Sequence, residues 1–431
     1  MSREENRKNF SKYVSQNILG MIGFSCYVLA DSYFISIAKG ADGLTALNLV
    51  MPLYSIIFSI GEMIGVGSAI RYAIGKIKKD ADADDYFWNA IIWCILSSIL
   101  FVFAGIFFSA DIMRILGADE HIVAVGNNYT KIFMCFAPMF MCNYVTNAFV
   151  RNDGAPGIAM SATLFSSLFN IVFDYILMFP MNLGMEGAAL ATALSPIIGM
   201  GICSIHFFSK KSSVRLVVCK PSVRKLVAGS QLGVSAFVGE MSSAVITLAF
   251  NFVILKLAGN VGVAAYGVVA NIAIVTTAVF NGVAQGSQPL ISSCFGRGDK
   301  DGCTQLKRMG YTTAFVLAAV MYSILFIFAG QFVAVFNSEG SEMLRLYATE
   351  GVKLYFIGIF FAGINIVGGG AFSATENAFK AAVVSVARGF VLILGAVFVM
   401  SALLGMTGVW LAYAVAEGIT TFIMLVMALR V

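Results

Sequence analysis

Long uninterrupted apolar runs dominate the chain, and short polar segments separate them. A helix needs about 20 apolar residues to cross a lipid bilayer, and each of these runs reaches that length. We predict twelve membrane spans, at residues 15–38, 45–72, 87–109, 122–148, 158–180, 187–208, 232–257, 262–294, 310–335, 346–372, 379–403 and 406–429. A membrane β-barrel would instead show alternating strands of about 10 residues. The pattern therefore predicts an all-α membrane protein.

Composition supports the choice of lipid as the main solvent of the surface. Hydrophobic residues make up 59% of the 431 residues and charged residues only 12%, whereas soluble domains carry about 25% charged residues. The first twelve residues are polar and charged, and the apolar stretch after them is too long for the core of a signal peptide. We interpret that stretch as the first span.

Lys and Arg are distributed unevenly between the two sides of the predicted topology. Twelve spans place both termini on one side, which holds 22 of these residues, Arg430 included, against 6 on the other side. Because basic loops stay in the cytoplasm, we predict a multi-pass protein of the bacterial plasma membrane with both termini cytoplasmic. The net charge of +5 follows from this topology and indicates no nucleic-acid partner.

The two halves of the chain resemble each other. Residues 183–194 read LGMEGAALATAL and residues 404–415 read LGMTGVWLAYAV, at an offset of 221. Each half crosses the membrane six times, so the repeats are parallel and related by a pseudo-two-fold axis along the membrane normal. The substrate site of such transporters lies between the lobes near mid-membrane. We predict an N-lobe, a cytoplasmic linker and a C-lobe at 1–209, 210–228 and 229–431.

Five carboxylates fall inside predicted spans: Asp31, Glu62, Asp174, Glu240 and Glu417. A charge at the bilayer centre costs at least about 2.5–3.5 kcal/mol, and none of the five has a basic residue three or four positions away. They are therefore protonated, bound to a cation, or satisfied by polar contacts between helices. For Glu62 a close helix contact is an alternative, and for Glu417 an ion pair with Arg388.

Asn170 and Asp174 form the sharpest local pattern, because a spacing of four residues places both on one face of an otherwise apolar helix. An amide and a carboxylate together can coordinate Na⁺ or pass a proton; the alternative is a polar contact between helices. Glu240 and Glu62, with Asn251 at the repeat position of Asp31, are our candidates for binding a cationic substrate. No catalytic cluster and no metal site is visible.

Several segments together resemble the multidrug and toxin extrusion (MATE) family of transporters, in its bacterial MepA-like or DinF-like branch. They are LADSYFISIAKGADGLTALNLVMP around Asp31, VRNDGAPGIAM after span 4, FNIVFDYILMFPMNLGMEGAALATALS, NVGVAAYGVVANI, and GVAQGSQPLISSCFGRGD. The resemblance covers nearly the whole chain. It implies a MATE-type fold and export of multiple drugs and organic cations by alternating access, coupled to H⁺ or Na⁺ and without a cofactor.

The same resemblance implies a cation site in the N-lobe. The DinF-like branch uses an Asp on span 1, an Asn and an Asp on span 5, and a Thr on span 6. The matching positions here are Asp31, Asn170, Asp174 and Thr192. Other members carry an acidic residue on span 7, and Glu240 lies on that span about one turn away from that position.

Three other classes of protein compete with this interpretation. A lipid or lipid-linked-sugar flippase of the same superfamily would share the lobes, but it needs a cationic cavity for pyrophosphate, whereas the intramembrane charges here are mostly acidic. A membrane-embedded enzyme would need a HExxH or paired-Asp motif, which the sequence lacks. A passive channel would not need the repeat and the linker. We therefore expect a monomeric transporter, not an enzyme, whose partners are small lipophilic cations and membrane lipids.

Overall fold

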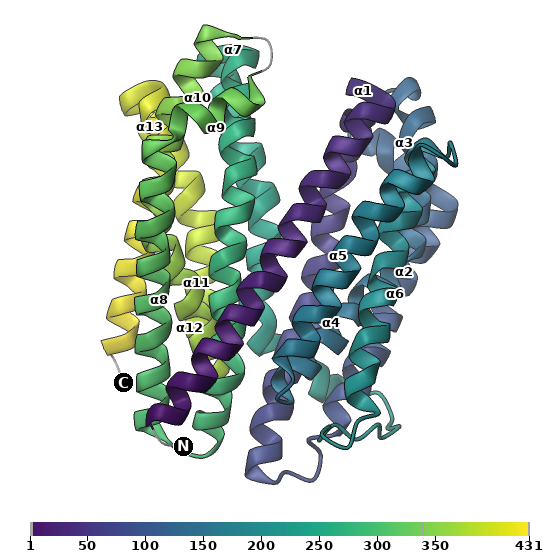
Figure 1. Cartoon of the computed structure of the whole chain (residues 1–431), viewed down its shortest axis with the longest axis vertical. Coiled ribbons are helices and arrows are strands. Elements are labelled where there is room, and N and C mark those ends of the chain that lie inside the picture. Colours follow the sequence, from purple (N-terminus) through teal and green to yellow (C-terminus); the bar gives the residue numbers. More distant parts are fainter. Residues whose placement is uncertain (1–2, 338–339, 430–431) are drawn as a thin grey trace.

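The computed structural model describes residues 3–337 and 340–429, so Arg430 and the outer ends of the two predicted lobes lie outside the described residues. The helices are α1 (Arg3–Lys78), α2 (Asp85–Ile115), α3 (Glu120–Cys135), α4 (Ala137–Asn152), α5 (Pro156–Met178), α6 (Gly184–Phe207), α7 (Val223–Gly296), α8 (Lys300–Ile327), α9 (Ala329–Phe336), α10 (Glu342–Tyr355), a 3₁₀ turn (Phe356–Gly358), α11 (Ile359–Ala374), α12 (Ala378–Val386), a π-helical turn (Ala387–Val391) and α13 (Leu392–Leu429). They form two side-by-side bundles, with both termini at one end (Figure 1).

The longest helices turn back on themselves at glycines. A straight helix as long as the 74-residue α7 would extend about 110 Å, far beyond the bilayer. The chain reverses at Gly259, with φ 62° and ψ −157°, a conformation that an L-residue rarely adopts. Gly40 and Gly405 adopt the same conformation in α1 and α13.

The reversals reconcile the helices with the twelve predicted spans. By length and composition, nine helices of the described chain can cross a membrane, or ten when α3 and α4, which meet at 46°, count as one span. Among these, α7 and the run Ala378–Ala428 each turn back at a glycine and supply two crossings. The all-α fold of twelve spans in two lobes is therefore confirmed.

The internal repeat extends to the backbone. Residues with a positive φ angle recur in corresponding connections of the two halves, and their separations are close to the offset of 221 seen in the sequence. The pairs are Gly40 with Gly259, Lys79 with Gly298, Gly117 with Gly340, Gly154 with Glu376, and Gly184 with Gly405. Because these conformations end helices and set their exit direction, the two lobes fold along the same path.

Each lobe has its own apolar core, and the two cores exchange helix ends. The N-lobe core includes Tyr72, Phe133 and Phe149, and the C-lobe core includes Phe280 and Trp410. Phe10 and Val14, from the first turns of α1, belong to the C-lobe core, whereas Leu232 of α7 belongs to the N-lobe core. Figure 1 shows α1 running diagonally between the bundles.

Glycines allow the helices to touch where they cross between the lobes. A Cβ on Gly233 would lie 1.9 Å from the Met63 carbonyl oxygen, and one on Gly286 would lie 2.7 Å from Val14 Cα. A Cβ on Gly67 would lie 2.0 Å from the Gly229 carbonyl oxygen. These contacts lie toward the ends of α1 and α7 and away from their turns at Gly40 and Gly259. The lobes are therefore in contact at the end of the molecule that carries the chain termini.

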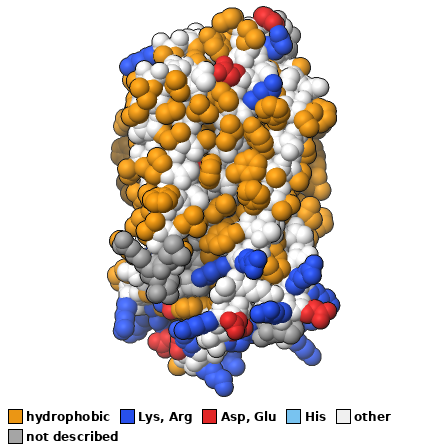
Figure 2. Space-filling view, turned by 90° about the vertical axis from the view of Figure 1, so that its left-hand side faces the viewer, with side chains coloured by type: hydrophobic (Ala, Val, Ile, Leu, Met, Phe, Trp, Pro, Cys, Tyr) orange, Lys and Arg blue, Asp and Glu red, His pale blue; other side chains and the backbone are white. Residues whose placement is uncertain are grey.

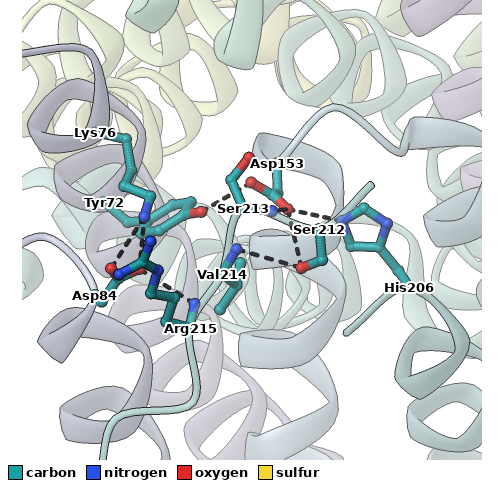
Figure 3. Close-up of polar contacts among 9 residues, drawn as sticks. All are labelled: Tyr72, Lys76, Asp84, Asp153, His206, Ser212, Ser213, Val214 and Arg215. Carbon is teal, nitrogen blue, oxygen red and sulfur yellow. Dashed lines mark hydrogen bonds and ion pairs between the residues drawn. The ribbon is translucent and has the colours of Figure 1, made fainter. Parts of the chain in front are cut away.

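The segment after α6 is attached to the N-lobe by a buried carboxylate (Figure 3). Asp153 accepts hydrogen bonds from the Tyr72 hydroxyl at 2.8 Å, from the Ser213 backbone N–H at 2.8 Å and from the Ser212 hydroxyl at 3.3 Å, and it contacts His206 Nε2 at 2.8 Å. Asp84 accepts from the Arg215 N–H at 3.2 Å. The segment therefore packs along one lobe; the boundaries of the linker and of the lobes stay a prediction.

Candidate functional site

Asp31 of α1 and Asp174 of α5 lie close together inside the N-lobe. Asp31 is 7% exposed and Asp174 is fully buried, and the two carboxyl groups are near enough to interact electrostatically. One oxygen of each, Oδ1, has no hydrogen-bond partner among the described residues. The structure thus brings together two acids that are 143 positions apart in the sequence.

Asn170 and Thr192 complete this group of four residues. Asn170 is fully buried one turn before Asp174, and Thr192 of α6 is 2% exposed. With its amide oxygen turned to Thr192, Asn170 accepts from the Thr192 hydroxyl at 3.2 Å and donates to Asp174 Oδ2 at 3.1 Å. Asn170 thereby orients the carboxylate of Asp174.

Oxygen atoms dominate this group of four residues, and the described residues place no basic side chain in contact with either carboxylate. Two buried carboxylates cannot both stay charged without a counterion, so at least one carries a proton or shares a cation. Carboxylate, amide and hydroxyl oxygens are the donors that hard cations prefer. The residues present therefore fit H⁺ or Na⁺ as an exchangeable ion. No group of three His, Cys, Asp or Glu side chains in the described ranges could hold a resident metal ion.

A larger cavity lies beside this pocket, between the lobes. It encloses about 1060 Å³ of space, part of which is open to solvent, and is lined by residues of α1, α4, α5, α6 and α7. Phe24, Tyr27, Phe58, Phe140 and Tyr144 supply an aromatic surface. Tyr27 lines the cavity and has Asp31 and Asp174 among its charged neighbours, so the cavity wall adjoins these two acids.

Two of the predicted substrate-binding residues line this cavity, and one does not. Glu62 of α1 and Glu240 of α7 face it from different lobes, and the two acids are close enough to repel each other. Asn251, which is half-buried on α7, is not among the lining residues. The cavity is thus acidic on two sides, which suits a cationic ligand.

Arg151 is a charged residue of this cavity that the sequence pattern did not indicate. Its place after span 4 suggested a solvated loop, but it is 5% exposed in the last turn of α4 and lines the cavity. Arg151 Nη1 donates to Gln285 Oε1 at 2.6 Å and to Asn17 Oδ1 at 3.4 Å. The position just before Asn152-Asp153-Gly154, at the end of an apolar span, was its only signal.

Glu417 belongs to a separate cluster in the C-lobe, whose polar side chains pair with one another. Arg388 Nη2 lies 2.6 Å from Glu417 Oε1, and Asn365 Nδ2 donates to Glu417 Oε2 at 2.7 Å. The hydroxyl of Thr421 donates to Asn365 at 3.0 Å. The proposed ion pair between Arg388 and Glu417 is confirmed, and its completeness indicates a structural role. The π-helical turn Ala387–Val391 carries Arg388 to this place.

Arg388→Met is expected to destabilise the protein by about 3–5 kcal/mol, because it leaves the Glu417 carboxylate buried without its cation. The double variant Arg388→Met, Glu417→Leu removes both charges and should recover most of that loss. Thermal unfolding of the purified protein in detergent measures both. A single variant as stable as the wild type would contradict the structural role.

Comparison of the sequence with known proteins identifies the family of this chain. Residues 17–176 and 236–400 match the profile of the MatE family. The chain belongs to the MatE family. The multidrug export protein MepA of Staphylococcus saprophyticus is 26% identical over 410 residues, and MepA of Staphylococcus aureus strain MRSA252 is 27% identical over 414 residues. Both alignments cover 93% of this chain and 89% of the relative. The MatE chain is therefore a transporter, not an enzyme.

Solved structures share the fold of this MatE protein. One, described as the outward-facing conformation of a multidrug resistance MATE family transporter of the MOP superfamily, superposes with a TM-score of 0.92 at 20% identity and covers 99% of this chain and 96% of that chain. Another, a MOP superfamily transporter from Pyrococcus furiosus described as having a binding pocket of reverse polarity, gives 0.91 at 20% identity, over 99% of this chain and 95% of its own.

Proposed function

We propose that this protein exports small lipophilic organic cations across the bacterial plasma membrane in exchange for H⁺ or Na⁺. The observation that carries the proposal is the pair of buried carboxylates, Asp31 and Asp174, beside a cavity lined by Glu62 and Glu240. The pair supplies an ion site, and the cavity supplies an acidic, aromatic surface for a cationic ring. The names of the MepA relatives, which are multidrug exporters, support the same substrate class.

The coupling follows from differential affinity in two states of the lobes. In the state described here, the lobes are in contact through Gly67 and Gly233 at the end that carries the termini. An ion on Asp31 and Asp174 would favour one arrangement of the lobes, and a substrate in the cavity would favour the other. Alternating occupancy then moves the two solutes in opposite directions.

We propose that both termini are cytoplasmic and that the protein acts as a monomer in contact with lipid. Figure 2 shows Lys and Arg side chains gathered at the lower end of the molecule, below an apolar surface. The termini lie at this same end in Figure 1. The positive-inside rule assigns that end to the cytoplasm. The closed crossing of the lobes would then face the cytoplasm.

A lipid or lipid-linked-sugar flippase is the alternative that shares this architecture. Its anionic headgroup would meet Glu62 and Glu240 in the cavity, against the single guanidinium of Arg151. Excess negative charge disfavours a pyrophosphate ligand. Export of cations therefore fits the charges of the cavity better.

The test uses the full-length protein in proteoliposomes that contain a lipophilic cationic dye. A proton gradient and a sodium gradient are imposed separately, with empty liposomes as the control. We expect one gradient to drive the dye against its own concentration gradient. Dye movement that is independent of both gradients, or movement of a fluorescent lipid in its place, would contradict the proposal.

A further inference from the structure

The guanidinium of Arg151 has an unused buried donor beside the substrate cavity. The side chain is 5% exposed and lines the cavity. Its Nη1 is occupied by Gln285 and Asn17, but its Nε has no hydrogen-bond partner among the described residues. An unpaired buried donor is rare in folded proteins, and each one calls for a physical reason. A ligand in the cavity would supply the missing acceptor.

The two acids of the cavity do not neutralise Arg151 directly. Gln285 stands between Arg151 and Glu62, because it accepts from Arg151 at 2.6 Å and donates from Nε2 to Glu62 Oε1 at 3.3 Å. In the described part of the chain, Arg151 makes no ion pair within 4 Å, and Glu240 reaches the cavity from the other lobe. Positive and negative charges therefore remain at separate places on the cavity wall.

We propose that Arg151 forms a subsite for an anionic group of the substrate. Its guanidinium donates to a carboxylate or another anionic oxygen, while the cationic part of the same molecule lies against Glu62 and Glu240. The inference rests on the proposed export function and deepens it. A guanidinium offers donors in a fixed fork that match a carboxylate, so it selects anionic oxygen over an ester. The site would thus prefer molecules that carry both charges over simple cations of the same shape.

The experiment compares two dyes that differ only in this group. A rhodamine methyl ester is a cation without an anionic oxygen, and the corresponding free acid carries a carboxylate on the same rings. Gradient-driven transport of each dye is measured in proteoliposomes, and the ratio of the free-acid rate to the ester rate is the readout. Arg151→Met should lower this ratio by about 10-fold or more, the effect of losing a hydrogen bond between charged groups.

Two further variants make the outcome decisive. Arg114→Met removes an exposed arginine outside the cavity and should leave the ratio unchanged. Arg151→Lys keeps the charge without the fork, so the ratio should fall by less than for Met, and this variant decides the matter if Arg151→Met does not fold. An equal fall of both rates would show that Arg151 only holds the lobes together and would overturn the subsite, as would an unchanged ratio. Failure of the wild type to transport either dye would instead refute the proposed function.

Discussion

Asp174→Asn is expected to reduce gradient-driven dye export to about one tenth of the wild-type rate or less, because the variant cannot exchange a proton or hold a cation with Asp31. The same loss is expected for Asp31→Asn. Folding should not suffer, since the Asp174 carboxyl is buried without a basic partner and its neutral isostere avoids that cost. The expected signature is lost transport with an unchanged or raised melting temperature.

Tyr175→Phe is the matched control for this prediction. Tyr175 follows Asp174 on the same helix but is 54% exposed on the outside of the bundle, so its variant should transport normally. Transport is measured in proteoliposomes under the driving gradient, and stability by thermal unfolding in detergent. Wild-type transport by Asp174→Asn would exclude the N-lobe ion site. A strongly lowered melting temperature would mean that Asp174 is structural, like Glu417.

Gly233→Ala is expected to slow transport by about 5- to 150-fold, because its methyl group would lie 1.9 Å from the Met63 carbonyl oxygen. Overpacking of this kind costs about 1–3 kcal/mol. This free energy lowers the population of the state in which the lobes are in contact at Gly233 by the same factor of about 5 to 150. Alanine itself favours helix over glycine by about 1 kcal/mol, so the loss can only come from the contact between the lobes. The ion pair between Arg71 and Glu376 spans the same end and should be weakened with it.

For this variant we measure how readily a reagent reaches the cavity past the contact between the lobes at Gly233. Asn281→Cys, in a background without the eight native cysteines, reports access from the end that carries the termini, because Asn281 of α7 lines the cavity. We expect faster labelling by a membrane-impermeant thiol reagent in Gly233→Ala than in its parent. Gly267→Ala is the control, because a Cβ there meets nothing within 4 Å. Equal labelling and equal transport in the two alanine variants would contradict a closed crossing at Gly233.

The membrane spans and the repeat could be predicted because both follow from local properties. Apolar length specifies a span, and the offset of 221 between LGMEG and LGMTG is seen again as the left-handed pair Gly184 and Gly405. The tightness of the turns between these spans was not predictable in the same way. The predicted spans break at residues 39–44 and 258–261, but Gly40 and Gly259 reverse the chain there at a single residue of non-helical conformation, without an extended loop.

The residues of the candidate site could be predicted only where a charged side chain falls within a membrane span, because burying a charge in lipid costs free energy. Asp31 and Asp174 were conspicuous as buried acids, and the structure places them together. Arg151 was hidden because a basic residue at the end of a span is ordinarily a loop residue that faces the cytoplasm. Its burial depends on Gln285, which is 134 positions away on the other lobe. Contacts between lobes of this kind have no local pattern.

Exchange through the Asp31–Asp174 pocket is tested most directly by running the transporter backwards. A cationic dye is added to proteoliposomes without any ion gradient, and the internal H⁺ or Na⁺ concentration is followed with a reporter. Coupling is reciprocal, so the dye gradient should drive one of these ions in the opposite direction in the wild type and in Tyr175→Phe, and not in Asp174→Asn. Dye entry without ion movement in the wild type, or equal ion movement in Asp174→Asn, would contradict the account.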